Sequence, residues 1–222
     1  MSKNNLVINQ FNFLCTLMMT QILKQKSFPD GMDFGGVLFG NRIPQDYFET
    51  KGIGQSDIAI HAGSYHLALK AAGIEMYNII TYSSILPGIA KRVEKPTNKV
   101  HGAVMESIMS VCHAQKGERA SAGIIYGWLY DKQTNDKFGG LVCEHYGNCP
   151  EEEIQQRLNA SLNELYVNGF SEKYNLLDIH TITESFVPEK NYGTALVALC
   201  FTSYYYPIIS SYDKSGVNYL NN

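Results

Sequence analysis

The sequence predicts an α+β fold, a sandwich of antiparallel strands covered by helices. The predicted elements follow the order helix, strands, helix, strand, which is typical of helices and strands packed in separate layers. The chain has 222 residues, enough for one sizeable domain. Its contents of 45% hydrophobic and 18% charged residues are ordinary for a folded globular protein.

The first part of this order comes from residues 61–145. A helix is predicted over 61–73, because its apolar residues gather on one side and Gly73 is a common helix stop. Residues 134–136 (Thr-Asn-Asp) predict a hairpin turn. β-Rich runs that predict strands lie at 76–82, 103–112, 121–130 and 139–145.

The second helix has clear signals at both ends. Pro150 suits the first helical position, and the glutamates at 151–153 complement the positive end of the helix dipole. Asn168-Gly169 predicts the end of the helix, and a last buried strand is expected over 194–203. The apolar stripe of this helix is expected to bury Ile154, Leu158, Leu162 and Leu165.

The N-terminal residues 1–45 are expected to form an accessory extension, an amphipathic helix followed by a Gly-rich connection. No basic cluster and no small-residue cleavage site accompany the apolar stretch, so a signal peptide is a poor fit. The stretch is also too short to span a membrane. The helical spacing is carried by Phe11, Leu14, Cys15, Met18 and Ile22.

Charge and cysteine content narrow the class of protein. The net charge is −3 and no dense basic run occurs, which argues against a nucleic-acid partner; Lys91-Arg92 comes nearest and is interpreted as a solvated loop. Five cysteines without a CxxC pair favour a reducing compartment, and we expect the cytoplasm. The spacing of Cys143, His145 and Cys149 could hold zinc, but a buried small residue beside a partly exposed histidine is the simpler interpretation, and no metal is predicted.

The segment 78–87 (NIITYSSILP) carries the most chemical information. It places Ser83-Ser84 at the end of an apolar run, six residues after Asn78 and just before a proline. A serine there can attack the preceding carbonyl, and an N-to-O acyl shift, β-elimination and hydrolysis then leave a pyruvoyl group at residue 84. The dipeptide alone is not specific, since Ser210-Ser211 occurs in a Tyr-rich tail and a strand end turning into a loop is the ordinary alternative.

The surrounding motifs add that specificity. Segment 78–87 resembles the processing site of pyruvoyl-dependent arginine decarboxylases, Asn-x5-Ser/Thr-Ser-[Ile/Val]-[Leu/Met]-Pro. Residues 51–57 (KGIGQSD) resemble the family's Gly-Ile-Gly-Glu-Ser-Asp loop, and 100–106 and 140–144 follow in the family's order. The resemblance covers about residues 45–205, so we expect a decarboxylase domain over 46–205 and a C-terminal tail over 206–222.

The resemblance implies a fold, an assembly and an activity. The fold would be a four-layer αββα sandwich, and the assembly a homotrimer of protomers cleaved into 1–83 and 84–222, with active sites at subunit interfaces. The pyruvoyl group made from Ser84 would decarboxylate an amino acid through a Schiff base, converting L-arginine to agmatine and CO2. Neither pyridoxal phosphate, a metal, a membrane nor a nucleic acid would be needed.

Three residues are expected to carry this chemistry. Ser84 is the nucleophile of processing, and Asn78 matches the family position that assists it; its amide could donate to the oxyanion, or it could simply cap a strand start. Glu144 matches the family acid that returns a proton to Cα, which requires a raised pKa; the alternative is an exposed carboxylate at a strand end. Glu106 and Glu184 match no catalytic position of the family.

The substrate-binding positions include one departure from the family. By resemblance, Tyr65, Gly54 and Ile85 are expected at the substrate site, with the glycines of 52–57 letting backbone approach the ligand. Where the family carries an aspartate that holds the guanidinium, this chain carries His66. Either Glu75 or Asp57 takes that role, or the substrate is another amino acid. A non-catalytic trimeric relative that never processes is the third alternative.

Overall fold

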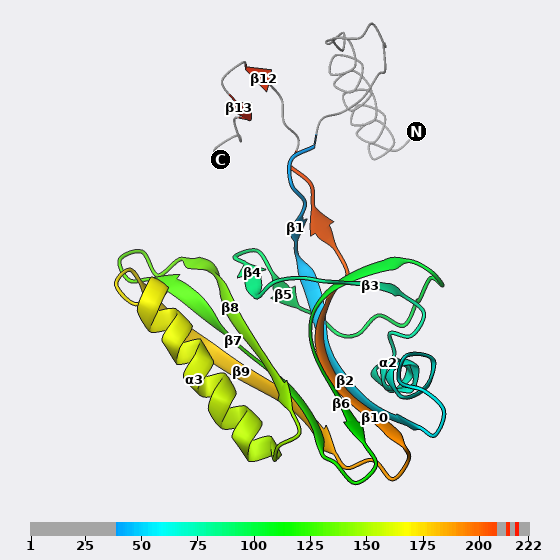
Figure 1. The fold of residues 1–222 in the computed structure, drawn as a ribbon. Coiled ribbons are helices and arrows are strands. Elements are labelled where there is room, and N and C mark those ends of the chain that lie inside the picture. The colour runs from blue at the N-terminus through cyan, green and yellow to red at the C-terminus, as the bar shows by residue number, and fades with distance from the viewer. Residues whose placement is uncertain (1–38, 208–211, 214–215, 218–222) are drawn as a thin grey trace, which may run out of the picture. The chain divides into compact units, whose positions relative to one another are not determined.

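The computed structural model describes residues 39–207, 212–213 and 216–217 (Figure 1). Residues 43–204 form one compact unit, which contains all the predicted site residues. The predicted helix of the N-terminal extension lies outside the described residues. Two short ladders complete the strand list: β1 (Ile43–Pro44) with β11 (Tyr204–Tyr205), and β12 (Tyr212–Asp213) with β13 (Gly216–Val217).

Two sheets form the compact unit. The first has the order β3-β6-β10-β2-β5 and comprises β3 (Asn78–Thr81), β6 (Val104–Gln115), β10 (Tyr192–Phe201), β2 (Asp46–Ser56) and β5 (Lys91–Arg92). The second has the order β4-β8-β7-β9 and comprises β4 (Ile85–Pro87), β8 (Lys137–Gly147), β7 (Ala120–Asp131) and β9 (Tyr174–Phe186). The long strands pair antiparallel, whereas the edge pairs β3–β6 and β2–β5 are parallel.

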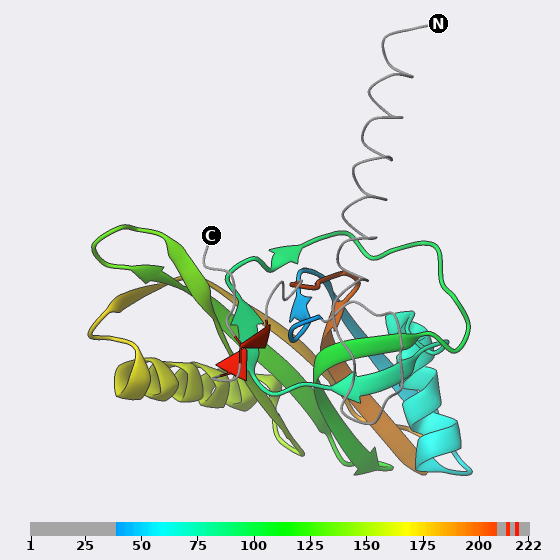
Figure 2. The same ribbon diagram turned by 90° about the horizontal axis from the view of Figure 1, so that it is seen from above.

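Helices cover the outer faces of both sheets. The π-helical turn η1 (Ile60–Tyr65) and helix α2 (His66–Ala72) lie against β2 of the first sheet, and α3 (Glu151–Gly169) lies across β7, β8 and β9 of the second (Figures 1 and 2). The layer order is therefore helix, sheet, sheet, helix. This confirms the predicted αββα sandwich.

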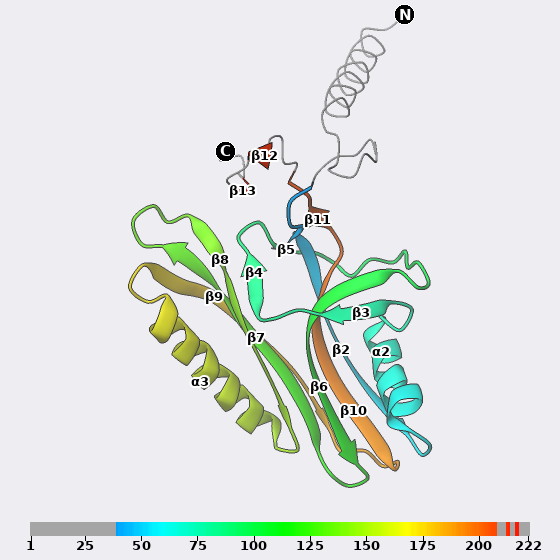
Figure 3. The ribbon, with the colours of Figure 1, turned by 45° about the horizontal axis from the view of Figure 1, so that its top comes forward.

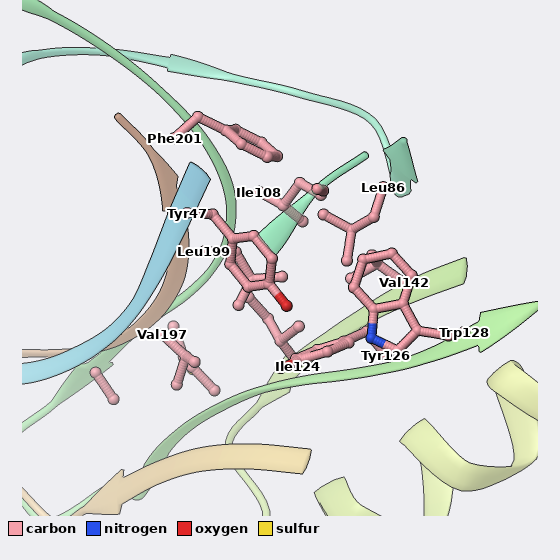
Figure 4. Packing of buried hydrophobic residues seen from close by; sticks show 14 of the residues in the cluster. Tyr47, Leu86, Ile108, Ile124, Tyr126, Trp128, Val142, Val197, Leu199 and Phe201 are labelled. Atoms are coloured by element: carbon pink, nitrogen blue, oxygen red, sulfur yellow. The ribbon is translucent and has the colours of Figure 1, made fainter. Parts of the chain in front are cut away.

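Strand alternation explains how the layers are held together. Along β10, Ala195, Val197 and Leu199 face the core between the sheets, whereas Leu196 and Ala198 face α2. The run is apolar throughout because both of its faces are buried. Large side chains such as Tyr47, Ile108 and Trp128 fill the core between the sheets (Figure 4).

Several predicted element boundaries need correction. The helix predicted over 61–73 is divided into η1 and α2, although it ends as expected at Gly73, whose φ is 74°. Pro150 is the N-cap of α3 and not its first helical residue. Leu165 is 38% exposed, so the buried stripe of α3 ends one turn earlier, at Leu162.

Residues 52–57 were predicted to form a loop. The structure shows that 52–56 are the last part of β2, which ends at Ser56. A β-carbon on Gly52 would lie 2.3 Å from the carbonyl oxygen of Ala68, and one on Gly54 would lie 2.2 Å from that of Ser64. These glycines therefore allow η1 and α2 to pack directly on the strand.

Candidate active site

The chain crosses from the first sheet to the second at Ser83-Ser84 (Figure 3). The Tyr82 amide donates to the carbonyl of Ser107 in β6 at 2.8 Å, the last backbone bond to the first sheet before the crossing. The Ser84 carbonyl accepts from the Val142 amide in β8 at 3.1 Å, the first bond to the second sheet. The two serines are thus fixed from both sides, at the edge formed by β3 and β4.

The structure brings Ser84 and Glu144 together. The Ser84 hydroxyl donates to Oε2 of Glu144 at 2.7 Å. The sheet register accounts for this contact: Ser84 bonds Val142, and Glu144 lies two residues further on the same face of β8. Two residues that are 60 positions apart in sequence therefore meet at hydrogen-bond distance.

Partial burial raises the pKa of Glu144 above its ordinary value of 4.5, because desolvation disfavours the carboxylate. The hydrogen bonds from the Ser84 hydroxyl and from the amide of Glu144 itself lower the pKa and offset part of the shift. Glu144 is therefore not the exposed strand-end carboxylate of the alternative interpretation. A raised pKa makes this carboxyl a better proton acceptor when ionised and lets it keep its proton to higher pH.

The carbonyl of the peptide bond between the two serines accepts a hydrogen bond from a backbone amide. The Ile85 amide donates to the Ser83 carbonyl at 3.0 Å, which closes a three-residue turn centred on Ser84. This carbonyl is the group that Ser84 would attack, and its oxygen gains negative charge in that step. A backbone amide already directed at it can stabilise that charge. No residue type in the sequence marks this backbone donor.

Tyr82 is anchored just ahead of the serines. Its hydroxyl donates to Oε2 of Glu106 at 2.5 Å, and its ring lies 5.5 Å from the ring of Phe201. Glu106 is only 2% exposed and belongs to β6. The structure thus gives Glu106 a part in holding the chain before the crossing, which the sequence did not suggest.

Asn78 lies away from this pair. It begins β3 and is exposed, and its Nδ2 donates to the Gly102 carbonyl at 2.8 Å. Residues 78–82 run alongside β6, and four extended steps span about 13 Å. The structure therefore does not bring Asn78 to Ser84 within one chain, and its observed contact is that of a residue at a strand start.

The predicted substrate-binding residues fall into two groups. Ile85 adjoins Ser84 and is 64% exposed, so an apolar surface lies next to the site. Tyr65 and His66 lie in η1 and α2 on the outer face of the first sheet, where the Tyr65 hydroxyl contacts Sδ of Met109 and His66 is exposed. Gly54 faces the same helical layer, so the close approach that it permits is to a helix and not to a ligand.

The possible zinc spacing forms no metal site. Among the residues that the structure describes, no group of three His, Cys, Asp or Glu side chains could hold a metal ion. Nε2 of His145 lies 3.0 Å from Nη1 of Arg157 instead. In the same described part of the chain, no helix has the length and apolar character needed to cross a membrane.

Comparisons with known proteins identify the family of this chain. The sequence model of the family described as "Pyruvoyl-dependent arginine decarboxylase (PvlArgDC)" matches residues 46–205. A Chlamydia muridarum protein named pyruvoyl-dependent arginine decarboxylase AaxB is 31% identical in an alignment of 188 positions that covers 75% of this chain and 94% of the relative. Pyruvoyl-dependent arginine decarboxylase 1 of Archaeoglobus fulgidus is 30% identical over 123 residues, 54% of this chain and 74% of that protein.

Proposed function

Because the chain belongs to the family of pyruvoyl-dependent arginine decarboxylases, we propose that it cleaves itself between Ser83 and Ser84 and then decarboxylates L-arginine to agmatine and CO2. The 2.7 Å hydrogen bond between Ser84 and Glu144 carries this proposal. It joins a nucleophile and a partly buried carboxyl at the peptide bond that the family processes.

In the processing step, the Glu144 carboxylate takes the hydroxyl proton of Ser84 as Oγ attacks the Ser83 carbonyl carbon. The Ile85 amide stabilises the oxyanion. The C–N bond then breaks to leave an ester and a free amine on residue 84. β-Elimination releases the Ser83 carboxylate, and tautomerisation and hydrolysis of the remaining dehydroalanine release ammonia. The second chain then begins with a pyruvoyl group.

The surroundings of residue 84 fit such a group. The Ser84 carbonyl accepts from the Val142 amide and its side chain faces Glu144, so these two residues would hold the group made from Ser84. A pyruvoyl ketone binds the amine of an amino acid and takes up the electron pair left when CO2 departs. Glu144, whose pKa burial raises, is then placed to return a proton to the substrate's α-carbon.

We further propose that the active site is completed in a homotrimer. Asn78, Tyr65 and His66 lie away from Ser84 in one chain, so a second copy must supply them if they act at the site. Exposed apolar side chains on β3, on β4, at the start of β6 and in the connection before it support an interface at this edge: Ile80 at 47%, Ile85 at 64%, Val104 at 60% and Val100 at 69%.

The identity of the amino-acid substrate has less support in the structure than the decarboxylation chemistry. Asp57 lies 4.0 Å from Lys190 and Glu75 lies 3.9 Å from Lys99, so each of these carboxylates already has a lysine partner. His66 cannot replace a carboxylate in binding a guanidinium bidentately. This observation favours, as a second candidate function, the same chemistry on an amino acid without a guanidinium.

Release of CO2 from L-arginine by fully cleaved protein tests the main proposal, with L-ornithine, L-lysine and L-glutamate assayed in parallel. We expect turnover of arginine, and almost none from Glu144→Gln. Turnover of another amino acid but not of arginine would establish the second candidate. If arginine is turned over well and His66→Asp brings no improvement, the second candidate is wrong.

We propose that the protein acts in the cytoplasm, a reducing compartment. Cys112, Cys143, Cys149 and Cys200 are all free thiols, which supports this location.

A further inference from the structure

A cleft of about 510 Å³ opens between the two sheets, between β5 on the first and β9 on the second. Basic and aromatic side chains line it together: Lys91, Arg92 and Lys137 with Tyr126, Trp128 and Tyr130. Ser84 and Glu144 do not line it. They lie by β4 and β8, toward the other edge of the sandwich, and buried Leu86 and Val142 belong to the core in between.

The cations of this cleft are only partly neutralised. Arg92 contacts both carboxylate oxygens of Glu49 at 3.2 Å, and the same carboxylate lies 3.2 Å from Nε2 of His180. Lys91 and Lys137, in contrast, have no carboxylate within ion-pair distance among the residues that the structure describes.

Lys137 is held in place by neutral groups. Its Nζ donates to the Ala90 carbonyl at 3.0 Å and lies 3.8 Å from the ring centroid of Trp128. Burial is the main cause that lowers the pKa of Lys137. The nearby charge of Lys91 lowers the pKa further, and Asp178 raises it. Lys91 and Lys137 both line the cleft, and Nζ of Lys137 bonds the carbonyl of the residue before Lys91, so two cations meet at one place where an anion would be favoured.

The wall on β9 has an unusual backbone. Asp178 has a φ of 51°, in the left-handed region that residues other than glycine rarely adopt, and it lies where the pairing of β7 and β9 shifts register. Its Oδ2 accepts from the Tyr130 hydroxyl at 3.0 Å, and the next residue, Ile179, is 53% exposed. Bulges and left-handed residues of this kind are over-represented next to functional sites and at sheet edges.

We propose that this cleft is a second binding site, for a small organic anion in which a phosphate or carboxylate adjoins a flat apolar body. The acidic group would lie between Lys91 and Lys137, and the flat body would lie against Tyr130 and Ile179. A cationic ligand fits less well, because Lys137 already occupies a face of Trp128 and Arg92 already pairs with Glu49.

The single tryptophan of the chain makes the test specific. Trp128 is the one tryptophan in 222 residues and it lines the cleft, so intrinsic fluorescence excited at its red edge reports on this site. The full processed protein is titrated at constant ionic strength with AMP, benzoate, inorganic phosphate, acetate and adenosine. Comparing AMP with benzoate shows whether the site prefers a phosphate or a carboxylate. Inorganic phosphate and acetate carry the acidic group without a ring, and adenosine carries the ring without the acidic group.

We expect a saturable change with AMP or benzoate and a much weaker one with the acid or the ring alone. Lys91→Gln and Lys137→Gln should each raise the midpoint by about three- to tenfold, since partly exposed charged contacts are worth about that much. Lys116→Gln removes an exposed lysine between β6 and β7, at the other end of β7, and should leave the midpoint unchanged. No saturable change with either ring-bearing acid, or equal midpoints in all three variants, would overturn the proposal.

Discussion

Glu144 is placed to act in two steps that need opposite protonation states. Processing needs the carboxylate, which takes the Ser84 proton, whereas turnover needs the acid, which returns a proton to the substrate. The Ser84 hydroxyl bond lowers the pKa of Glu144, and processing consumes that hydroxyl. Cleavage should therefore raise the pKa of Glu144 further and change the residue from a base into an acid.

Two pH profiles test this dual role. The rate of cleavage of freshly synthesised chain should rise with pH through the raised pKa of Glu144, because the base form increases. The turnover of cleaved protein should fall as pH rises through a still higher pKa, because the acid form is lost. Glu144→Gln should slow cleavage by about 10²- to 10⁴-fold and remove its pH dependence.

Gel or mass analysis of time courses measures the cleavage rate, and CO2 release measures turnover. Ser84→Ala, which cannot cleave, is the control for cleavage by contaminating proteases. A Glu144→Gln chain that cleaves at the wild-type rate would contradict the assignment of the base.

At the scale of elements, the sequence predicted the layers better than the individual strands. The apolar runs of β7 and β10 and the stripe of α3 were recognisable because each packs on at least one buried surface. β9 was not predicted, since most of its residues are only partly buried and show no alternation. β2 was taken for a loop where its glycines meet a helix, because a packing glycine and a loop glycine look alike in a sequence.

Gly54→Ala tests the contact between β2 and the helical layer. The new β-carbon would lie 2.2 Å from the Ser64 carbonyl oxygen and 2.4 Å from the Ala68 amide, so backbone must move. We expect a loss of about 1–3 kcal/mol in the free energy of unfolding, measured by denaturant titration.

Gly147→Ala is the matched control on a strand. Its β-carbon would meet only Sγ of Cys149, at an ordinary contact distance of 3.5 Å. Equal stability of the two variants would show that Gly54 is not required for this packing.

At the scale of the whole molecule, the fold explains why only part of the candidate site could be predicted from the sequence. Ser84 and Glu144 were each predicted, and the register of β4 on β8 brings them together. The Ile85 amide was missed because a backbone donor leaves no mark on residue type. Asn78 matches a family position and His66 stands where the family has an aspartate, yet the fold of one chain keeps both away from Ser84.

Complementation between two inactive variants tests the shared site. Chains with Ser84→Ala lack the cofactor but keep Asn78, and chains with Asn78→Ala keep Ser84. If neighbouring subunits complete each site, co-expression of the two should restore cleavage and turnover that neither shows alone. Native mass spectrometry checks that mixed trimers form. Mixed trimers without restored activity would contradict an active site built from two subunits.

The central claim, that the chain makes its own cofactor at Ser84, is tested most directly by an intact-mass spectrum of the purified protein. The account predicts two chains, 1–83 and 84–222, with the second lighter by one ammonia than a chain that begins with serine. A single uncleaved chain after prolonged incubation would contradict it and would favour a non-catalytic relative of the family.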